Sequence, residues 1–279
     1  MKQILLTNDD GYQSVGFYPL LKELEKSFSV TSVAPESERS WIGKSITAKK
    51  ELKVKKINLN GIPIYVCSGT PADCSQLGIY EFSKKRPDLV VSGINIGANV
   101  GHGRILSSGT IGAAMEAAID EVKALASSLQ LPDDIRKSAD FFHPKNYSMF
   151  ENAAKITAKI AKIVVQYPFE KGVDILSINI PFEATVENKI QITRPHREPY
   201  HRLFAKKNEG YSKKSIGDSS ARGKIDFTYK IGTDSYALSK NKISITPISL
   251  NLSREESFKK LNQLLKKNWS SGQEQSLSR

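Results

Sequence analysis

Two adjacent aspartates, Asp9 and Asp10, follow a short apolar run and precede a glycine in the segment ILLTNDDG, residues 4–11. Their like charges repel, and a folded chain tolerates that repulsion most readily when a positive group lies between the carboxylates. A metal ion, a neighbouring lysine or water alone could reduce the repulsion between the two carboxylates. A simple turn with a helix-capping carboxylate is also common after a strand. The aspartate pair alone does not distinguish a metal site from a lysine partner, water or a simple turn.

Three further polar clusters fall where strands or turns are predicted to end: PESERSWIGKS, SGTPAD and SGINIGANVGHGRILSSGT, at residues 35–45, 68–73 and 92–110. In an open parallel sheet, the carboxyl ends of the strands line one crevice. We therefore expect Asp9 and Asp10 to meet Ser40 and Asn95 there. All four side chains offer hard oxygen ligands, which suit Mg²⁺, Mn²⁺ or Ca²⁺ rather than zinc or copper. The sequence predicts a magnesium- or manganese-type ion.

The tetrapeptide SSGT, residues 107–110, stands immediately before a predicted helix. Backbone N–H groups at a glycine turn and the positive end of a helix form an anion site, to which Ser108 and Thr110 add hydroxyl groups. A metal ion beside such a site indicates hydrolysis of a phosphate ester, because the ion polarises a phosphoryl oxygen and acidifies a bound water. The dinucleotide pattern G-x-G-x-x-G and the P-loop pattern are both absent from the sequence.

The order of the predicted elements indicates a doubly wound, mostly parallel α/β sheet of Rossmann-like type. Strands are predicted at residues 4–7, 29–34, 88–91, 122–127 and 173–180, helices at 17–28, 71–82, 110–119 and 151–167, and a hairpin at 51–67. Residues 130–148 are expected to form a loop. We assign residues 1–185 to the catalytic domain. Residues 186–279 are expected to form a C-terminal β-hairpin arm and terminal helix for oligomerisation, not an independent domain.

The C-terminal part of the chain has a different character. Strands are predicted at residues 236–238 and 243–248 around a polar turn, and a last helix from about Ser253. Residues 194–230 carry ten Lys or Arg against four Asp or Glu, and the 279-residue chain has a net charge of +12. This balance suits an anionic partner such as a phosphate ester, a nucleotide or a nucleic acid, and a lysine-rich solubilising surface explains it equally well.

The hydrophobic segments, the N-terminus and the cysteines bear on where in the cell the protein is located. No apolar stretch approaches the roughly 20 residues that a membrane helix needs, and the N-terminus is too short and too soon acidic for a signal peptide. The two cysteines, Cys67 and Cys74, lack the spacing of a zinc site. We expect a cytoplasmic protein with reduced thiols and no membrane partner.

Five segments are similar, in order and spacing, to those of the SurE family (survival protein E), metal-dependent phosphatases that act as 5′/3′-nucleotidases: ILLTNDDG, APESERS, SGTPADC, DLVVSGINIGANVG and SGTIGAAMEAA. The resemblance is strong over residues 1–130 and looser over 173–255. It implies a 5′-nucleotidase, a phosphoric monoester hydrolase that converts nucleoside 5′- and 3′-monophosphates to nucleoside and phosphate, with short polyphosphate as a further substrate of some members. It also implies one Mn²⁺ or Mg²⁺ per subunit, and a homodimer or homotetramer that exchanges C-terminal elements.

The resemblance also implies roles for individual residues. The metal ligands are Asp9, Asp10, Ser40 and Asn95, of which Asp9 and Asn95 are also catalytic, and the phosphate contacts are Asn99, Ser108, Gly109 and Thr110. No firm general acid emerges; His102 and Lys44 are the nearest candidates. Trp41 is bulkier than the usual small residue, and the segment HGRILS is one residue longer than usual, so the nucleobase preference stays open.

The alternative function is a nucleic-acid-binding protein that uses the basic residues 194–230. If this alternative holds, the affinity of the protein for nucleic acid should fall steeply as the salt concentration rises, because protein contacts with phosphate release counterions. Tyr200, Phe204 and Tyr211 could stack on bases there, although they form no regular platform.

Overall fold

A nine-stranded sheet lies at the centre of the computed structural model, which describes residues 1–197, 203–213 and 229–274. The strand order is β3-β4-β2-β1-β5-β6-β7-β11-β8. These strands are β1 (Gln3–Thr7), β2 (Ser29–Pro35), β3 (Val54–Leu59), β4 (Ile62–Cys67), β5 (Leu89–Ile96), β6 (Ala124–Gln130), β7 (Ile175–Pro181), β8 (Ile190–Ile192) and β11 (Ile243–Ile248). The run from β4 to β7 is parallel, and β3 and β11 pair antiparallel with β4 and β7.

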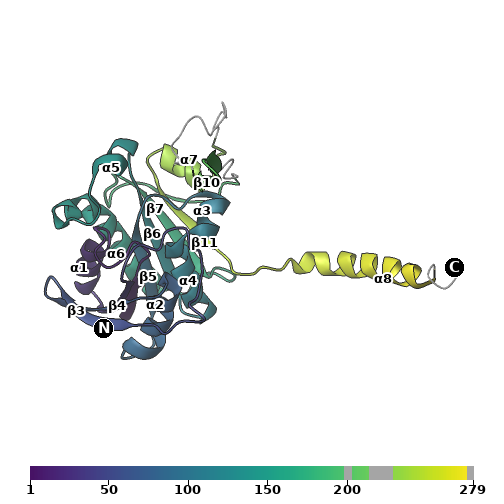
Figure 1. Ribbon diagram of the computed structural model, residues 1–279, viewed down its shortest axis with the longest axis horizontal. Helices are drawn as coiled ribbons and strands as arrows, with labels where there is room; N and C mark the ends of the chain where they lie inside the picture. The colour runs from purple at the N-terminus through teal and green to yellow at the C-terminus, as the bar shows by residue number, and fades with distance from the viewer. Residues whose placement is uncertain (198–202, 214–228, 275–279) are drawn as a thin grey trace.

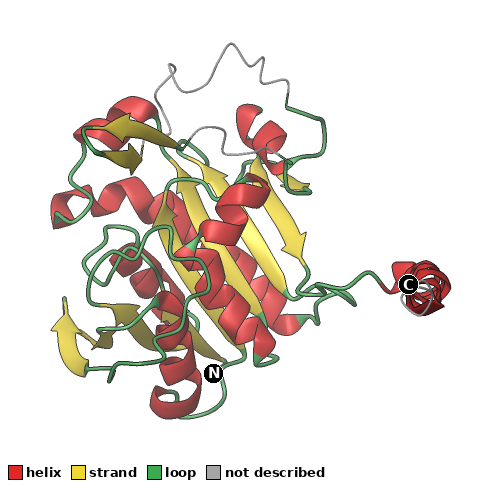
Figure 2. Ribbon diagram, turned by 45° about the vertical axis from the view of Figure 1, so that its right-hand side comes forward, coloured by secondary structure: helices red, strands yellow, loops and turns green. Residues whose placement is uncertain are grey.

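Helices cover both faces of this sheet (Figures 1 and 2). The α-helices in the described part of the chain are α1 (Phe17–Glu25), α2 (Pro71–Leu77), α3 (Gly101–Ser107), α4 (Gly109–Ile119), α5 (Asp133–Ser138), α6 (Glu151–Gln166), α7 (Asp234–Ser239) and α8 (Phe258–Glu274). One apolar core lies between the sheet and α1 with α6, and a second between the sheet and α2 with α4. Helix α6 buries Ala153, Ile156 and Ile160, whose three- and four-residue spacing places them on one face. The predicted doubly wound α/β fold is confirmed.

Two of the predicted elements are wrong. Residues 130–148, expected as a loop, contain α5 and most of a 3₁₀ helix, Pro144–Phe150. Residues 236–238, expected as a strand, belong to α7, because the Thr233 side chain accepts a hydrogen bond from the backbone N–H of Tyr236 and so caps a helix. A single turn this short carries too little periodicity to reveal its type in the sequence.

The hairpin arm consists of β9 (Phe204–Lys207) and β10 (Gly210–Lys213), which pair antiparallel. The other parts of the basic segment, residues 198–202 and 214–228, lie outside the described residues, and Tyr200 is among them. Strands β8 and β11 also come from the chain after residue 185, and both extend the central sheet.

The terminal helix α8 follows a short 3₁₀ turn, Glu255–Ser257, and projects away from the body of the protein (Figure 1). Within the described part of the chain, none of the helices has the length and apolarity required to span a bilayer.

Candidate active site

The predicted site residues converge because β2, β1 and β5 are neighbours and run parallel. Their carboxyl ends therefore meet at one edge of the sheet, where ligands bind in folds of this type. One pocket at this edge is lined by five of the predicted residues: Asp9, Ser40, Asn95, Asn99 and Ser108. Its wall also includes four residues that are not among the predicted metal ligands or phosphate contacts: Trp41, Arg104, Ser107 and Arg136.

Each of the two aspartates is held in place by a hydrogen bond from a residue far away in the chain. Thr110 donates its hydroxyl to Asp9 Oδ1 at 2.6 Å, and the Ile96 backbone N–H donates to Asp10 Oδ2 at 3.0 Å. Both side chains are buried, with exposed fractions of 3% and 4%. Thr110, expected to bind phosphate, is itself fully buried and its hydroxyl is committed to Asp9.

Burial strongly affects the ionisation of this pair. Desolvation raises the pKa of Asp9 from its ordinary value to about 6, although hydrogen bonds from the Thr110 side chain and backbone oppose the shift. Desolvation also raises the pKa of Asp10 well above its ordinary range, and the negative charge of Asp9 adds to that rise. The protein alone therefore stabilises two charged carboxylates poorly, and a bound cation would reverse both effects.

The donor set around the pair fits a hard divalent cation. Asn95 donates its amide N–H to Gly97 O at 2.6 Å, so its Oδ1 is the atom available as a ligand. Ser40 is exposed at the pocket and donates to Glu38 at 2.5 Å. In the described residues no Lys or Arg pairs with either aspartate, and no group of three His, Cys, Asp or Glu forms a metal cluster. A cation here would take two carboxylates and neutral oxygens, as Mg²⁺ and Mn²⁺ readily do.

Helix α4 begins at the pocket. Ser108 is its N-cap, and the Ser108 hydroxyl accepts a hydrogen bond from the Ile111 N–H at 3.2 Å. The next residue, Gly109, packs against Asp9: a Cβ at this position would lie 2.8 Å from the Asp9 Cβ. The positive end of α4 therefore faces both the carboxylate pair and any anion in the pocket.

Asn99 is fixed by residues that the sequence did not single out. Its side-chain amide donates to Ser128 Oγ at 3.0 Å, and its backbone N–H donates to Asn179 Oδ1 at 2.8 Å. Both partners lie on strands, β6 and β7, whose apolar neighbours dominate the sequence pattern. Ser128 and Asn179 are polar residues within otherwise apolar strands, and this is the sequence feature that could have identified them as site residues.

The two candidate general acids are not among the pocket-lining residues. Lys44 forms an ion pair with the buried Glu116 on α4. The His102 ring Nδ1 lies 3.1 Å from the backbone oxygen of His196. The side chains that line the pocket with positive charge are Arg104 and Arg136. Arg136 lies on α5, in the segment predicted as a loop, so the sequence gives no signal that it reaches the pocket.

Comparison with known proteins supports the resemblance drawn from the five motifs. Residues 4–202 match the model of the family described as survival protein SurE. A protein of Methanocaldococcus jannaschii named 5′-nucleotidase SurE is 42% identical over 89% of this chain and 92% of that protein. A protein of the same name from Methanosarcina acetivorans is 37% identical over 94% of this chain and 97% of that protein.

A solved structure agrees with these sequence relatives. The crystal structure of the SurE protein from Aquifex aeolicus matches with a TM-score of 0.74 and 31% identity, over 94% of this chain and 99% of that one. The nucleic-acid alternative receives no support from any of these matches. The chain belongs to the SurE family.

Proposed function

We propose that this chain is a divalent-metal-dependent phosphomonoesterase, a 5′-nucleotidase that releases phosphate from nucleoside 5′-monophosphates. The observation that carries the proposal is the buried Asp9–Asp10 pair beside the N-terminus of α4. Two relatives of this chain that are named 5′-nucleotidase SurE support the same activity. Nucleoside 3′-monophosphates and short polyphosphate are further substrates in this proposal, because their terminal phosphates have the same charge and shape.

Each residue has a distinct task in this reaction. Asp9, Asp10, Ser40 and Asn95 hold one Mn²⁺ or Mg²⁺ per subunit, which, when bound, would polarise the phosphoryl oxygen and acidify the attacking water. Thr110 keeps Asp9 oriented through its hydroxyl.

The phosphate itself is held by a second group of residues. Ser108 and the backbone N–H groups that begin α4, including Gly109, face its oxygens, and Asn99 adds a polar wall. Arg104 lines the same pocket and contributes the positive charge that draws in a phosphate dianion.

The proposal is tested by metal replacement with a substrate panel. Metal-stripped protein should release no phosphate from 5′-AMP, and Mn²⁺ or Mg²⁺ should restore release, because the buried carboxylates need a cation to stay charged together. Phosphate is measured with 5′-AMP, 3′-AMP and tripolyphosphate in parallel. Full activity in excess EDTA would refute the metal requirement, and no release from any substrate with either ion would refute the enzyme.

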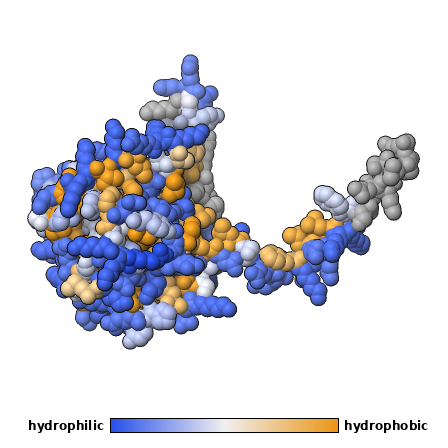
Figure 3. Space-filling view, turned by 90° about the horizontal axis from the view of Figure 1, so that it is seen from below, coloured by the Kyte–Doolittle hydropathy of each residue, from blue (hydrophilic) through white to orange (hydrophobic). Residues whose placement is uncertain are grey.

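The second part of the proposal is a homodimer or homotetramer assembled through α8. Every described side chain of this helix is exposed, and its apolar residues gather on one side (Figure 3). They are Phe258, Leu261, Leu264, Leu265 and Trp269. A helix of this length is only marginally stable in water unless its apolar face packs against something. Since α8 stands away from its own body, we assign that role to a second copy of the chain.

Disrupting this face should separate the subunits. We expect Leu261→Asp with Leu265→Asp to convert the assembled protein to a monomer at micromolar concentration, measured by sedimentation velocity. The matched control is Lys260→Glu, which changes charge on the same helix without touching the apolar row. A wild-type monomer at these concentrations, or an unchanged assembly in the double variant, would exclude α8 as the contact.

A further inference from the structure

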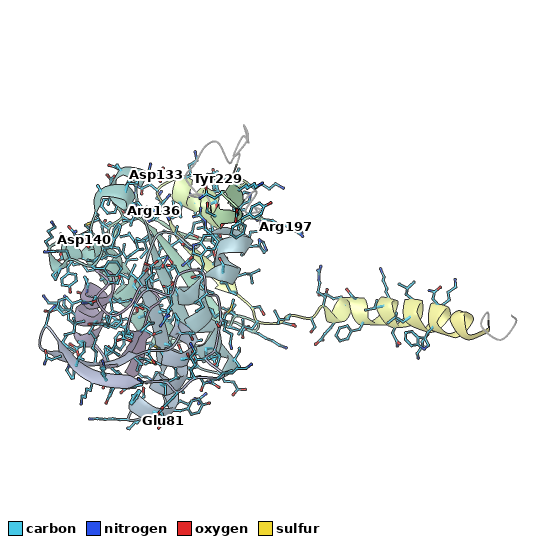
Figure 4. All side chains as sticks on the ribbon, viewed as in Figure 1. Glu81, Asp133, Arg136, Asp140, Arg197 and Tyr229 are labelled. Carbon is cyan, nitrogen blue, oxygen red and sulfur yellow. The ribbon has the colours of Figure 1, made fainter. Side chains whose placement is uncertain are left out.

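The pocket carries an aromatic side chain and a guanidinium that the phosphate reaction does not use. Trp41 lines the wall next to Ser40 and keeps 39% of its surface exposed. Arg136 lines the pocket from α5 and is exposed as well. Figure 4 shows Arg136 near Asp133 at the end of the molecule where α5 and α7 lie. Both side chains therefore border the same cavity as Asp9.

The backbone of Trp41 shows that its position is held, not incidental. Its φ is +62°, a left-handed conformation that is rare for a bulky side chain and usually persists only where the surroundings enforce it. The loop is anchored two residues later, where the Gly43 N–H donates to Ser107 O at 3.0 Å. Gly43 also packs against α4, because a Cβ on Gly112 would lie 2.3 Å from the Gly43 oxygen. The indole is thus presented at the pocket by a fixed loop.

We propose that Trp41 and Arg136 form a purine-binding subsite: the indole stacks on the base, and the guanidinium donates a hydrogen bond to purine N7. The inference rests on the proposed nucleotidase function, because it takes the phosphate to lie at Asp9 and Ser108. A ribose separates phosphate from base, so a base joined to that phosphate lies toward the rim of the pocket. A flat indole is a sequence-tolerant stacking surface there.

The two side chains together favour purines over pyrimidines. A purine offers a larger ring face to the indole than a pyrimidine does, so it gains more from stacking on that side chain. Only purines carry the N7 acceptor, which arginine contacts in many nucleic-acid complexes. The other arginine that lines the pocket, Arg104, donates a hydrogen bond to Ala98 O at 3.5 Å, and we assign it to the phosphate instead of the base.

The first experiment compares substrates with and without a base. The quantity measured is the ratio of kcat/KM for AMP to kcat/KM for ribose 5-phosphate, each with Mn²⁺. We expect Trp41→Ala to lower this ratio about tenfold and Trp41→Phe to keep most of it, since a phenyl ring still stacks. Tyr211→Ala removes an exposed aromatic ring outside the pocket and should leave the ratio at the wild-type value.

The guanidinium is tested by base discrimination. Wild-type protein should prefer AMP and GMP to CMP by about tenfold in kcat/KM, and Arg136→Ala should reduce that preference to less than threefold. Lys137→Ala, the neighbour on α5 that is absent from the pocket wall, is the matched control and should keep the preference. An unchanged ratio in Trp41→Ala together with an unchanged preference in Arg136→Ala would overturn the subsite.

A binding measurement separates this inference from the proposed function. The chain has two tryptophans, so Trp269→Phe leaves Trp41 as the single indole reporter. AMP should quench its fluorescence and ribose 5-phosphate should not. Equal quenching of Trp41 fluorescence by AMP and ribose 5-phosphate would refute the purine subsite without contradicting the proposed nucleotidase activity. If the proposed nucleotidase function is wrong, wild-type protein with Mn²⁺ will release no phosphate from either AMP or ribose 5-phosphate. That result would refute the purine subsite as well, because the subsite rests on the nucleotidase function.

Discussion

Replacement of Asp9 by asparagine is expected to lower kcat/KM for AMP by about a thousandfold at saturating Mn²⁺. The amide keeps the acceptor for the Thr110 hydroxyl, which lies 2.6 Å from Asp9 Oδ1, so the geometry of the pocket should be retained. What the variant loses is one of the two negative charges that hold a divalent ion. Phosphate release is measured under initial-rate conditions across a range of Mn²⁺ concentrations.

Stability distinguishes this loss from misfolding. Burial raises the pKa of Asp9 to about 6, so the metal-free native state is penalised as pH rises from the unfolded value near 4 through 6. A neutral side chain removes that penalty, and metal-free Asp9→Asn should melt no lower than wild type at pH 7. Glu81→Gln, an exposed carboxylate at the opposite end of the molecule from α5 (Figure 4), is the control and should keep full activity. A variant at Asp9 with more than a tenth of wild-type activity would contradict the ligand assignment.

Replacement of Gly109 by alanine is expected to lower kcat/KM about a hundredfold, within the range seen for misplaced catalytic groups. The new Cβ would lie 2.8 Å from the Asp9 Cβ and 3.1 Å from both Asp9 Oδ2 and the Arg39 backbone oxygen. Because Asp9 and the first turn of α4 cannot both keep their positions, the carboxylate must move relative to the phosphate site. The Mn²⁺ concentration for half-maximal activity should rise as well.

Gly210 supplies the matched control for this substitution, since a Cβ there meets nothing within 4 Å. Gly210→Ala should therefore retain wild-type kinetics. Unlike Asp9→Asn, Gly109→Ala keeps both carboxylates, so raising Mn²⁺ should recover part of its activity. Equal kinetics in the two alanine variants would show that the contact between α4 and Asp9 does not position the carboxylate.

Local sequence features predicted much of the site. Asp9 follows β1, Ser40 lies in the loop after β2, and Asn95 lies at the carboxyl end of β5. The rule that the ends of parallel strands share one crevice predicts that the three meet, and all three line the same pocket. The N-cap role of Ser108 is likewise local, because serine before a helix satisfies a free N–H in its first turn. Their chemical roles stay predictions until metal and substrate are measured.

The partners of individual side chains could not be predicted in this way. The sequence predicts a phosphate contact for Thr110, whereas its buried hydroxyl donates a hydrogen bond to Asp9. Lys44 was a candidate acid, yet it pairs with Glu116, because α4 places a buried carboxylate beside it. Each contact joins residues far apart in the chain, and no local pattern encodes their distance.

The sequence by itself determined the parallel sheet, most of the order of its strands and helices, and the acidic turn after β1, because apolar periodicity and turn chemistry depend on near neighbours. Only the tertiary structure decided that Trp41 and Arg136 border one pocket with Asp9, and that α8 stands apart from the body. These arrangements depend on how separate elements pack against each other, and packing is a property of the whole fold.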